Sequence, residues 1–299
     1  MTTGQKSLIV PPKNLKEAID WVLRVSGKDS SNDDSAIKGL TGELIKLLDK
    51  DAGEVARGVL EVMGKSFDKV VKGLKDFQDK NAISTFVLRG LIEKVSKSLQ
   101  KVTDYGSAAG PAFIKEVRGL LQKEVINPGE GPIGKLADGF KMFIGWQNNT
   151  VGQDGIGKPG GYQSKYDRNE AKWPSKPDEQ KTCALIFLGL LPLIFYFLPY
   201  LYAKCNEKGD WNSKGLANGE VKEFMESDAV GYTGNLGIKQ GSDVANILKS
   251  SFGELNREYE SAKKTIPRVR IKMSLTATSS TTMSAGPGYC PPAIQSLHS

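Results

Sequence analysis

Few residues in this chain are of the types that carry out chemistry. There are three cysteines, Cys183, Cys205 and Cys290, and a single histidine, His298. Three scattered cysteines are too few for a disulfide framework and have no zinc-site spacing. Ser-His-Asp and Cys-His catalysis both need a histidine, and the single histidine lies at position 298 of 299, away from the predicted helices. A single histidine also argues against a histidine-ligated metal centre. The sequence therefore predicts a non-enzymatic protein with no catalytic, cofactor-binding or metal-ligating residues.

Two short motifs match known patterns. Gly155, Gly157 and Gly160 have the G-x-G-x-x-G spacing of dinucleotide-binding loops, which requires a strand before the motif and a helix after it. Polar residues and glycines surround it here, so a plain loop is the interpretation. Asn148 and Thr150 complete an N-glycosylation sequon, which is used only in a lumenal location.

The charge is unevenly distributed. The net charge is +7, and no Asp or Glu follows Glu260, whereas five Lys or Arg residues lie between positions 263 and 272. A nearly neutral body with a basic tail is typical of membrane-surface contact or of solubility rather than of nucleic-acid recognition. No nucleic-acid partner is expected.

Most of the remaining sequence has helical periodicity. Apolar residues recur at spacings of three and four from position 15 to 99, from 111 to 126 and from 133 to 146, with charged residues between them. Asn14 and Glu17 form a capping-box-like start, and Gly27 is a natural stop, for a first helix expected to lie on the surface with its apolar face docked. Pro111 suits the first turn of another helix. These patterns predict an all-α amphipathic helix bundle.

Composition divides the chain into five parts. A long polar stretch rich in Gly and Pro resembles a disordered linker, and the basic, Ser/Thr/Pro-rich end resembles a disordered tail. The expected parts are an N-terminal helical domain (1–146), a linker (147–181), a transmembrane helix (182–204), a short helical region (205–265) and a tail (266–299).

The apolar run "CALIFLGLLPLIFYFLPYLYAKC" is the most distinctive stretch. Residues 182–203 include no charged side chain. A helix over 183–203 would be about 31 Å long, close to the roughly 30 Å of a bilayer core. A membrane-spanning helix is the favoured interpretation, with Tyr202 at its interfacial end. Its representative residues are Cys183, Leu185, Leu188, Pro192, Phe195, Pro199 and Tyr202.

An alternative follows from the two prolines. A turn near Pro192 would fold the run into a buried or interfacial hairpin and bring Cys183 toward Cys205, where a disulfide could form. In a straight helix these cysteines are about 33 Å apart, far beyond disulfide reach. The two models are mutually exclusive.

Three blocks of the sequence resemble one family. "PPKNLKEAIDWVLRVSGKD", the apolar run, and "VKEFMES…GNLGIKQGSDVANIL…SFGELNREY" are similar, in wording, order and spacing, to the alpha subunit of the Babesia variant erythrocyte surface antigens. The resemblance covers about residues 8–262, and this chain would be a short member of that family.

The resemblance implies a variant surface antigen displayed on infected erythrocytes. Its expected roles are antigenic variation and cytoadhesion through a host endothelial receptor, with a beta subunit and the lipid bilayer as partners and no catalytic residues. The start, "MTTGQKSLIVPPK", has too short an apolar stretch for a classical signal peptide. The alternative function is a soluble helical interaction module, or a non-functional family fragment, with the apolar run as a buried hairpin.

Overall fold

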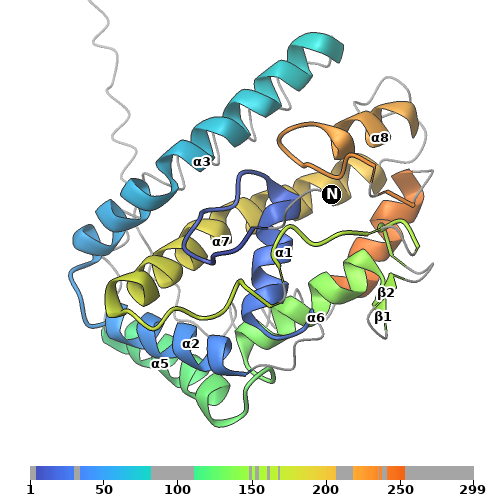
Figure 1. Ribbon diagram of the computed structural model, residues 1–299. Helices are drawn as coiled ribbons and strands as arrows, with labels where there is room; N and C mark the ends of the chain where they lie inside the picture. The colour runs from blue at the N-terminus through green and yellow to red at the C-terminus, as the bar shows by residue number, and fades with distance from the viewer. Residues whose placement is uncertain are drawn as a thin grey trace, which may run out of the picture.

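The structure is a bundle of helices around one hydrophobic core (Figure 1). The computed structural model describes residues 5–29, 34–81, 111–147, 150–151, 155–159, 162–167, 169–206, 218–234, 236–237 and 241–252. Its helices are α1 (Leu15–Val25), α2 (Ser35–Leu47), α3 (Ala52–Asn81), α5 (Pro111–Ile126), α6 (Pro132–Ile144), α7 (Pro177–Asn206) and α8 (Asn218–Glu226), followed by a helix over 241–252. The all-α prediction is therefore confirmed for the described residues.

The strand content of the described part is minimal. Strands β1 (Trp146–Gln147) and β2 (Thr150–Val151) form a two-residue antiparallel ladder, in which Trp146 pairs with Val151 and Gln147 with Thr150. Isolated bridges join Gln5 to Tyr166 and Gly157 to Leu236. These pairings attach loops to the bundle and form no layer of their own.

Helix α7 is the centre of the bundle. It contacts α1, α2 and α3, while α5 packs on α2 and α6, and α1 packs on α6 (Figure 1). The buried residues of α7 occur on several sides of the helix: Cys183, Ala184, Leu185, Ile186, Phe187, Leu190, Leu193, Ile194, Phe197, Leu198, Leu201 and Cys205.

The prediction of a transmembrane helix over 182–204 is corrected by this burial. In the described part of the chain, no helix is both long and apolar enough to cross a bilayer. The described apolar side chains of this run, among them Leu185, Leu193 and Phe197, are buried in the protein core instead. Leucine, isoleucine and phenylalanine are as well accommodated in a protein core as in lipid, so composition alone did not separate the two environments.

The hairpin alternative is also wrong. Helix α7 runs without interruption through Pro192 and Pro199, and Cys183 and Cys205, both buried and free, lie near its two ends. An interior proline costs a helix about 3 kcal/mol. Burial of apolar side chains on both sides of each proline outweighs that cost and keeps the helix continuous.

Helix α1 begins as predicted but is more deeply buried than predicted. The Asn14 side chain accepts a hydrogen bond from the Glu17 amide at 2.9 Å, and the Glu17 carboxylate accepts one from the Lys13 amide at 2.9 Å. Gly27, with φ of 70°, follows the end of the helix. In place of the expected surface position, all residues of α1 except Glu17 are buried. A helix with charged residues on one face becomes fully buried only if those charges have partners.

Helices α3 and α7 approach closely because glycines lie at their contact. A Cβ placed on Gly58 would lie 3.1 Å from Leu185 Cδ1, and one placed on Gly189 would lie 3.3 Å from Met63 Cβ. Each glycine therefore receives a large side chain of the opposite helix.

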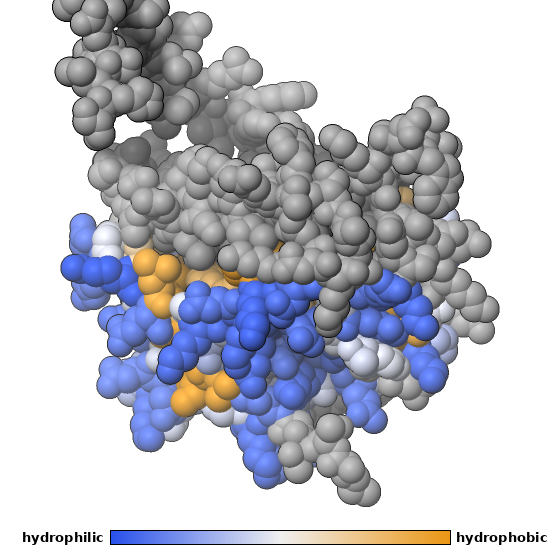
Figure 2. All heavy atoms as spheres, turned by 90° about the horizontal axis from the view of Figure 1, so that it is seen from above, coloured by the Kyte–Doolittle hydropathy of each residue, from blue (hydrophilic) through white to orange (hydrophobic). Residues whose placement is uncertain are grey.

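The surface of the molecule is mainly hydrophilic where the structure describes it. Seen from above, the described residues show only small, separate hydrophobic areas (Figure 2).

A buried carboxylate joins α5 to α6. Glu124 is completely buried, and its carboxylate accepts hydrogen bonds from the backbone amides of Gly129 (2.8 Å), Ile133 (2.9 Å) and Gly134 (3.3 Å). The amides in the first turn of a helix have no partner within the helix. Glu124 supplies that partner for α6, which begins at Pro132, and the negative charge suits the helix N-terminus.

We expect Glu124→Ala to lower the free energy of unfolding by about 2–3 kcal/mol, because buried amides would lose a charged acceptor. Gln122→Ala, on an exposed position of the same helix, should change it by less than about 0.5 kcal/mol. Urea denaturation followed by circular dichroism measures both. Equal effects of the two substitutions would contradict this role for Glu124.

Several predictions concern residues outside the described part. These are the helical pattern from position 82 to 99, the sequon residue Asn148, Cys290, His298 and the tail over 266–299. They stay predictions.

Candidate functional site

The first candidate site is a buried polar cluster on α1. Lys16 and Asp20 lie one helical turn apart, and Lys16 Nζ is 2.7 Å from Asp20 Oδ2, with side-chain exposures of 8% and 1%. Lys16 Nζ also donates to the Gln163 carbonyl at 2.7 Å. The Asp20 carboxylate accepts from the Tyr162 hydroxyl at 2.6 Å and from the Lys165 amide at 2.8 Å. These contacts attach residues 162–165 to the polar face of α1.

A second pair extends the cluster along the same face. Arg24 Nε donates to the Ala171 carbonyl at 2.8 Å, and Arg24 Nη1 lies 3.3 Å from Asp29 Oδ1. Both side chains of this ion pair are 4% exposed. The described residues of the 147–181 segment, which composition assigned to a linker, thus cover the charged face of α1 (Figure 1).

Burial shifts the pKa values of the ionisable groups in the cluster. Burial raises the pKa of the Asp20 carboxyl, while the charge and hydrogen bond of Lys16 and the Tyr162 hydroxyl act against that rise. Burial also raises the pKa of the Tyr162 and Tyr232 hydroxyls well above their ordinary value. Lys16 Nζ lies 4.7 Å from the centre of the Tyr162 ring, a favourable cation–π distance. Asp20 is buried, and three donors contact its carboxylate: the Lys16 ammonium, the Tyr162 hydroxyl and the Lys165 amide.

In its described part, the glycine motif caps a helix through two backbone amides. The Ile156 amide donates to the Phe143 carbonyl at 2.8 Å, and the Gly157 amide donates to the Ile144 carbonyl at 3.0 Å. These are two of the last carbonyls of α6. A Cβ placed on Gly155 would lie 2.0 Å from the Gly145 amide nitrogen, so glycine is needed for this close approach. Gly160 lies outside the described residues.

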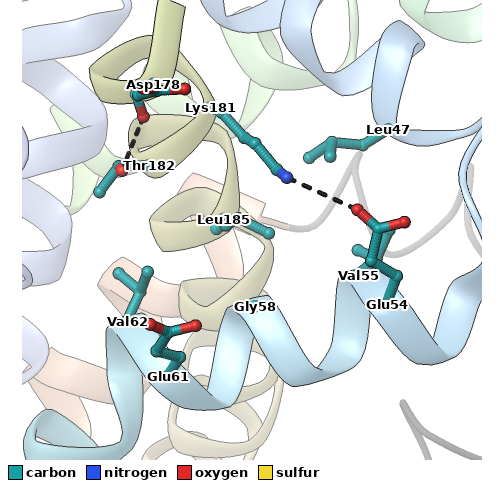
Figure 3. A pocket seen from close by; sticks show the side chains of 10 residues that line it. All are labelled: Leu47, Glu54, Val55, Gly58, Glu61, Val62, Asp178, Lys181, Thr182 and Leu185. Atoms are coloured by element: carbon teal, nitrogen blue, oxygen red, sulfur yellow. Dashed lines mark hydrogen bonds and ion pairs between the residues drawn. The ribbon is translucent and has the colours of Figure 1, made fainter.

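The second candidate site is a pocket between α3 and the first turns of α7, which we call the α3–α7 pocket (Figure 3). Its volume is about 220 Å³. It is lined by Leu47, Glu54, Val55, Gly58, Glu61, Val62, Asp178, Lys181, Thr182 and Leu185. Lys181 reaches across the pocket to Glu54, with 3.6 Å between Nζ and Oε1. The lining combines apolar side chains with three carboxylates and one ammonium.

The residues predicted to span a membrane all lie in α7 but do not form a site. Cys183 and Leu185 are buried, Leu188 and Tyr202 are half-buried, and the backbones of Pro192, Phe195 and Pro199 are helical. Of these, only Leu185 lines the α3–α7 pocket. Burial raises the pKa of the Cys183 and Cys205 thiols to about 12, which makes both poor nucleophiles at neutral pH.

Sequence reasoning missed the polar cluster. A usable signal was present: Lys16, Asp20 and Arg24 recur every four residues and form a charged stripe on one face of α1. Two tyrosines, Tyr162 and Tyr166, also stand out in an otherwise polar segment. The pocket had no comparable signal, because its residues come from three separate helices.

The described residues include no group of three or more His, Cys, Asp or Glu side chains that could hold a metal ion. Comparison with known proteins found no matching family model, no matching curated protein and no matching solved structure.

Proposed function

We propose that this chain is a non-enzymatic variant surface antigen of infected erythrocytes, a relative of the Babesia alpha subunits. It would serve antigenic variation and cytoadhesion by presenting a changeable surface on a fixed helical core. A beta subunit would be its partner in display, and the host endothelial receptor would contact its exposed residues.

The observation that carries this proposal is the meeting of the three family-like blocks in one core. The Leu15 amide of the first block donates at 3.2 Å to the carbonyl of Ala229, which lies between two quoted parts of the third block. Trp21 of the first block stacks on Phe187 of the second, with ring centres 6.4 Å apart. Gly241 of the third block lies against Cys205 of the second. The three segments that resemble the family therefore contact one another in the core.

This arrangement suits a protein whose surface changes between variants. Substitutions at exposed positions usually alter the free energy of unfolding by less than about 0.5 kcal/mol, whereas core substitutions cost far more. A packed core under a hydrophilic surface would let exposed residues vary without unfolding the chain.

The burial of α7 favours a second candidate function. A helical interaction module, binding other proteins through the α3–α7 pocket or the helix surfaces, needs no apolar segment outside its own core. This candidate differs from the first in where the protein is found.

Antibodies raised against the folded chain separate the two. Under the surface-antigen proposal, they label intact infected erythrocytes, and trypsin treatment of the intact cells removes the signal. Labelling that appears only after permeabilisation would contradict display and leave the interaction module.

A further inference from the structure

The α3–α7 pocket has a chemistry that fits a long basic side chain. Its apolar lining includes Val55, Val62 and Leu185, and the Leu185 side chain packs against Gly58 of α3 (Figure 3). The volume of about 220 Å³ is below the roughly 300–1,000 Å³ of pockets that hold drug-sized ligands. Arginine and lysine bury an apolar stem and keep the charge at the rim, which this shape allows.

The charges around the pocket do not balance. Three carboxylates, Glu54, Glu61 and Asp178, face one cation, Lys181, so the lining carries a net charge of −2 (three negative, one positive). Lys181 is engaged with Glu54. Among the described residues Glu61 has no ion-pair partner, so an added cation would be attracted rather than repelled.

The chain itself contains a segment of complementary character. Residues 263–272, "KKTIPRVRIK", carry five Lys or Arg and no acid. Its basic residues Arg268, Arg270 and Lys272 alternate with the apolar residues Val269 and Ile271. When such a segment is extended, its basic side chains lie on one side and its apolar side chains on the other. We propose that residues 263–272 of the same chain dock on the α3–α7 pocket, with one basic side chain inserted between Glu61 and Asp178.

The test uses a fluorescein-labelled peptide with the sequence of residues 263–272 and the chain of 299 residues. A tail-neutral variant carries Gln in place of Lys263, Lys264, Arg268, Arg270 and Lys272. In fluorescence anisotropy we expect the peptide to bind the tail-neutral variant at least tenfold more tightly than the unmodified chain, whose own segment occupies the pocket.

Charge reversal identifies the site. In the tail-neutral variant, Glu61→Lys should weaken peptide binding at least tenfold. Asp68→Lys makes the same change on an exposed position of α3 outside the pocket and should weaken it less than twofold. Equal effects of the two substitutions would show unspecific attraction and overturn the proposal.

Two further results would also overturn it. Equal peptide binding to the unmodified and tail-neutral chains would mean that the segment does not occupy the pocket. A concentration-dependent dimer of the unmodified chain, absent from the tail-neutral variant in analytical ultracentrifugation, would mean that the segment docks on a second copy instead.

Discussion

Asp20→Ala is expected to lower the free energy of unfolding by about 3–5 kcal/mol, because it leaves the buried Lys16 ammonium without its counter-charge. Lys16 and Asp20 are almost fully buried and lie 2.7 Å apart. The substitution also removes the acceptor for the Tyr162 hydroxyl and the Lys165 amide. Urea denaturation measures the loss.

Two controls show that burial causes the effect. Lys6 and Glu170 form an ion pair of similar length, 2.8 Å, at the surface, so Glu170→Ala should cost no more than about 1 kcal/mol. The double variant Lys16→Met/Asp20→Leu removes both charges and should recover part of the loss. If Asp20→Ala costs no more than Glu170→Ala, the polar face of α1 is solvated and the 162–165 contact does not form.

Trp21→Ala is the second substitution with a large expected effect, about 3–5 kcal/mol. Trp21 is fully buried, its Nε1 donates to the Leu8 carbonyl at 2.9 Å, and its ring stacks on Phe187 of α7. Truncation would leave a large cavity between α1 and α7 and an unpaired carbonyl. Met142→Ala, at a residue that is 53% exposed, should change the free energy of unfolding by less than about 0.5 kcal/mol.

A double-mutant cycle tests the contact itself. The loss of unfolding free energy in the Trp21→Ala/Phe187→Ala double variant should differ from the sum of the two single losses by about 0.5–1.5 kcal/mol. This is the range for stacked aromatic pairs. Strict additivity in urea denaturation would show that the two rings do not touch and that α7 does not pack on α1.

Local signals in the sequence predicted the local features of the fold. The Asn14 cap and Pro111 as the first residue of α5 appear as expected. Each of these features depends on residues within one or two helical turns, so a periodic pattern is enough to reveal it.

The features that the sequence did not predict depend on distant residues. The burial of α7 requires a receiving surface on α3 in which Gly58 accepts Leu185, more than 120 positions away. The cover over Lys16 and Asp20 comes from residues 162–165, which contribute backbone groups as well as the Tyr162 hydroxyl. Nearly every residue type has the same backbone N–H and C=O groups, so composition could not identify this segment as a partner of buried charges.

The apolar run is a buried helix packed against α3. The most direct test of this packing is a disulfide between Met63→Cys and Gly189→Cys in a chain whose three native cysteines are replaced by alanine. A Cβ at position 189 would lie 3.3 Å from the Cβ at position 63, close to the 3.5–4.5 Å of disulfides. Gly64→Cys with Gly189→Cys is the control, because a Cβ at position 64 meets nothing within 4 Å.

After mild oxidation of the two proteins, non-reducing mass spectrometry of tryptic peptides measures the cross-link. We expect a linked peptide for the 63–189 pair and none for the 64–189 pair. Absence of the 63–189 link, or equal linking of both pairs, would contradict the packing of the apolar run against α3.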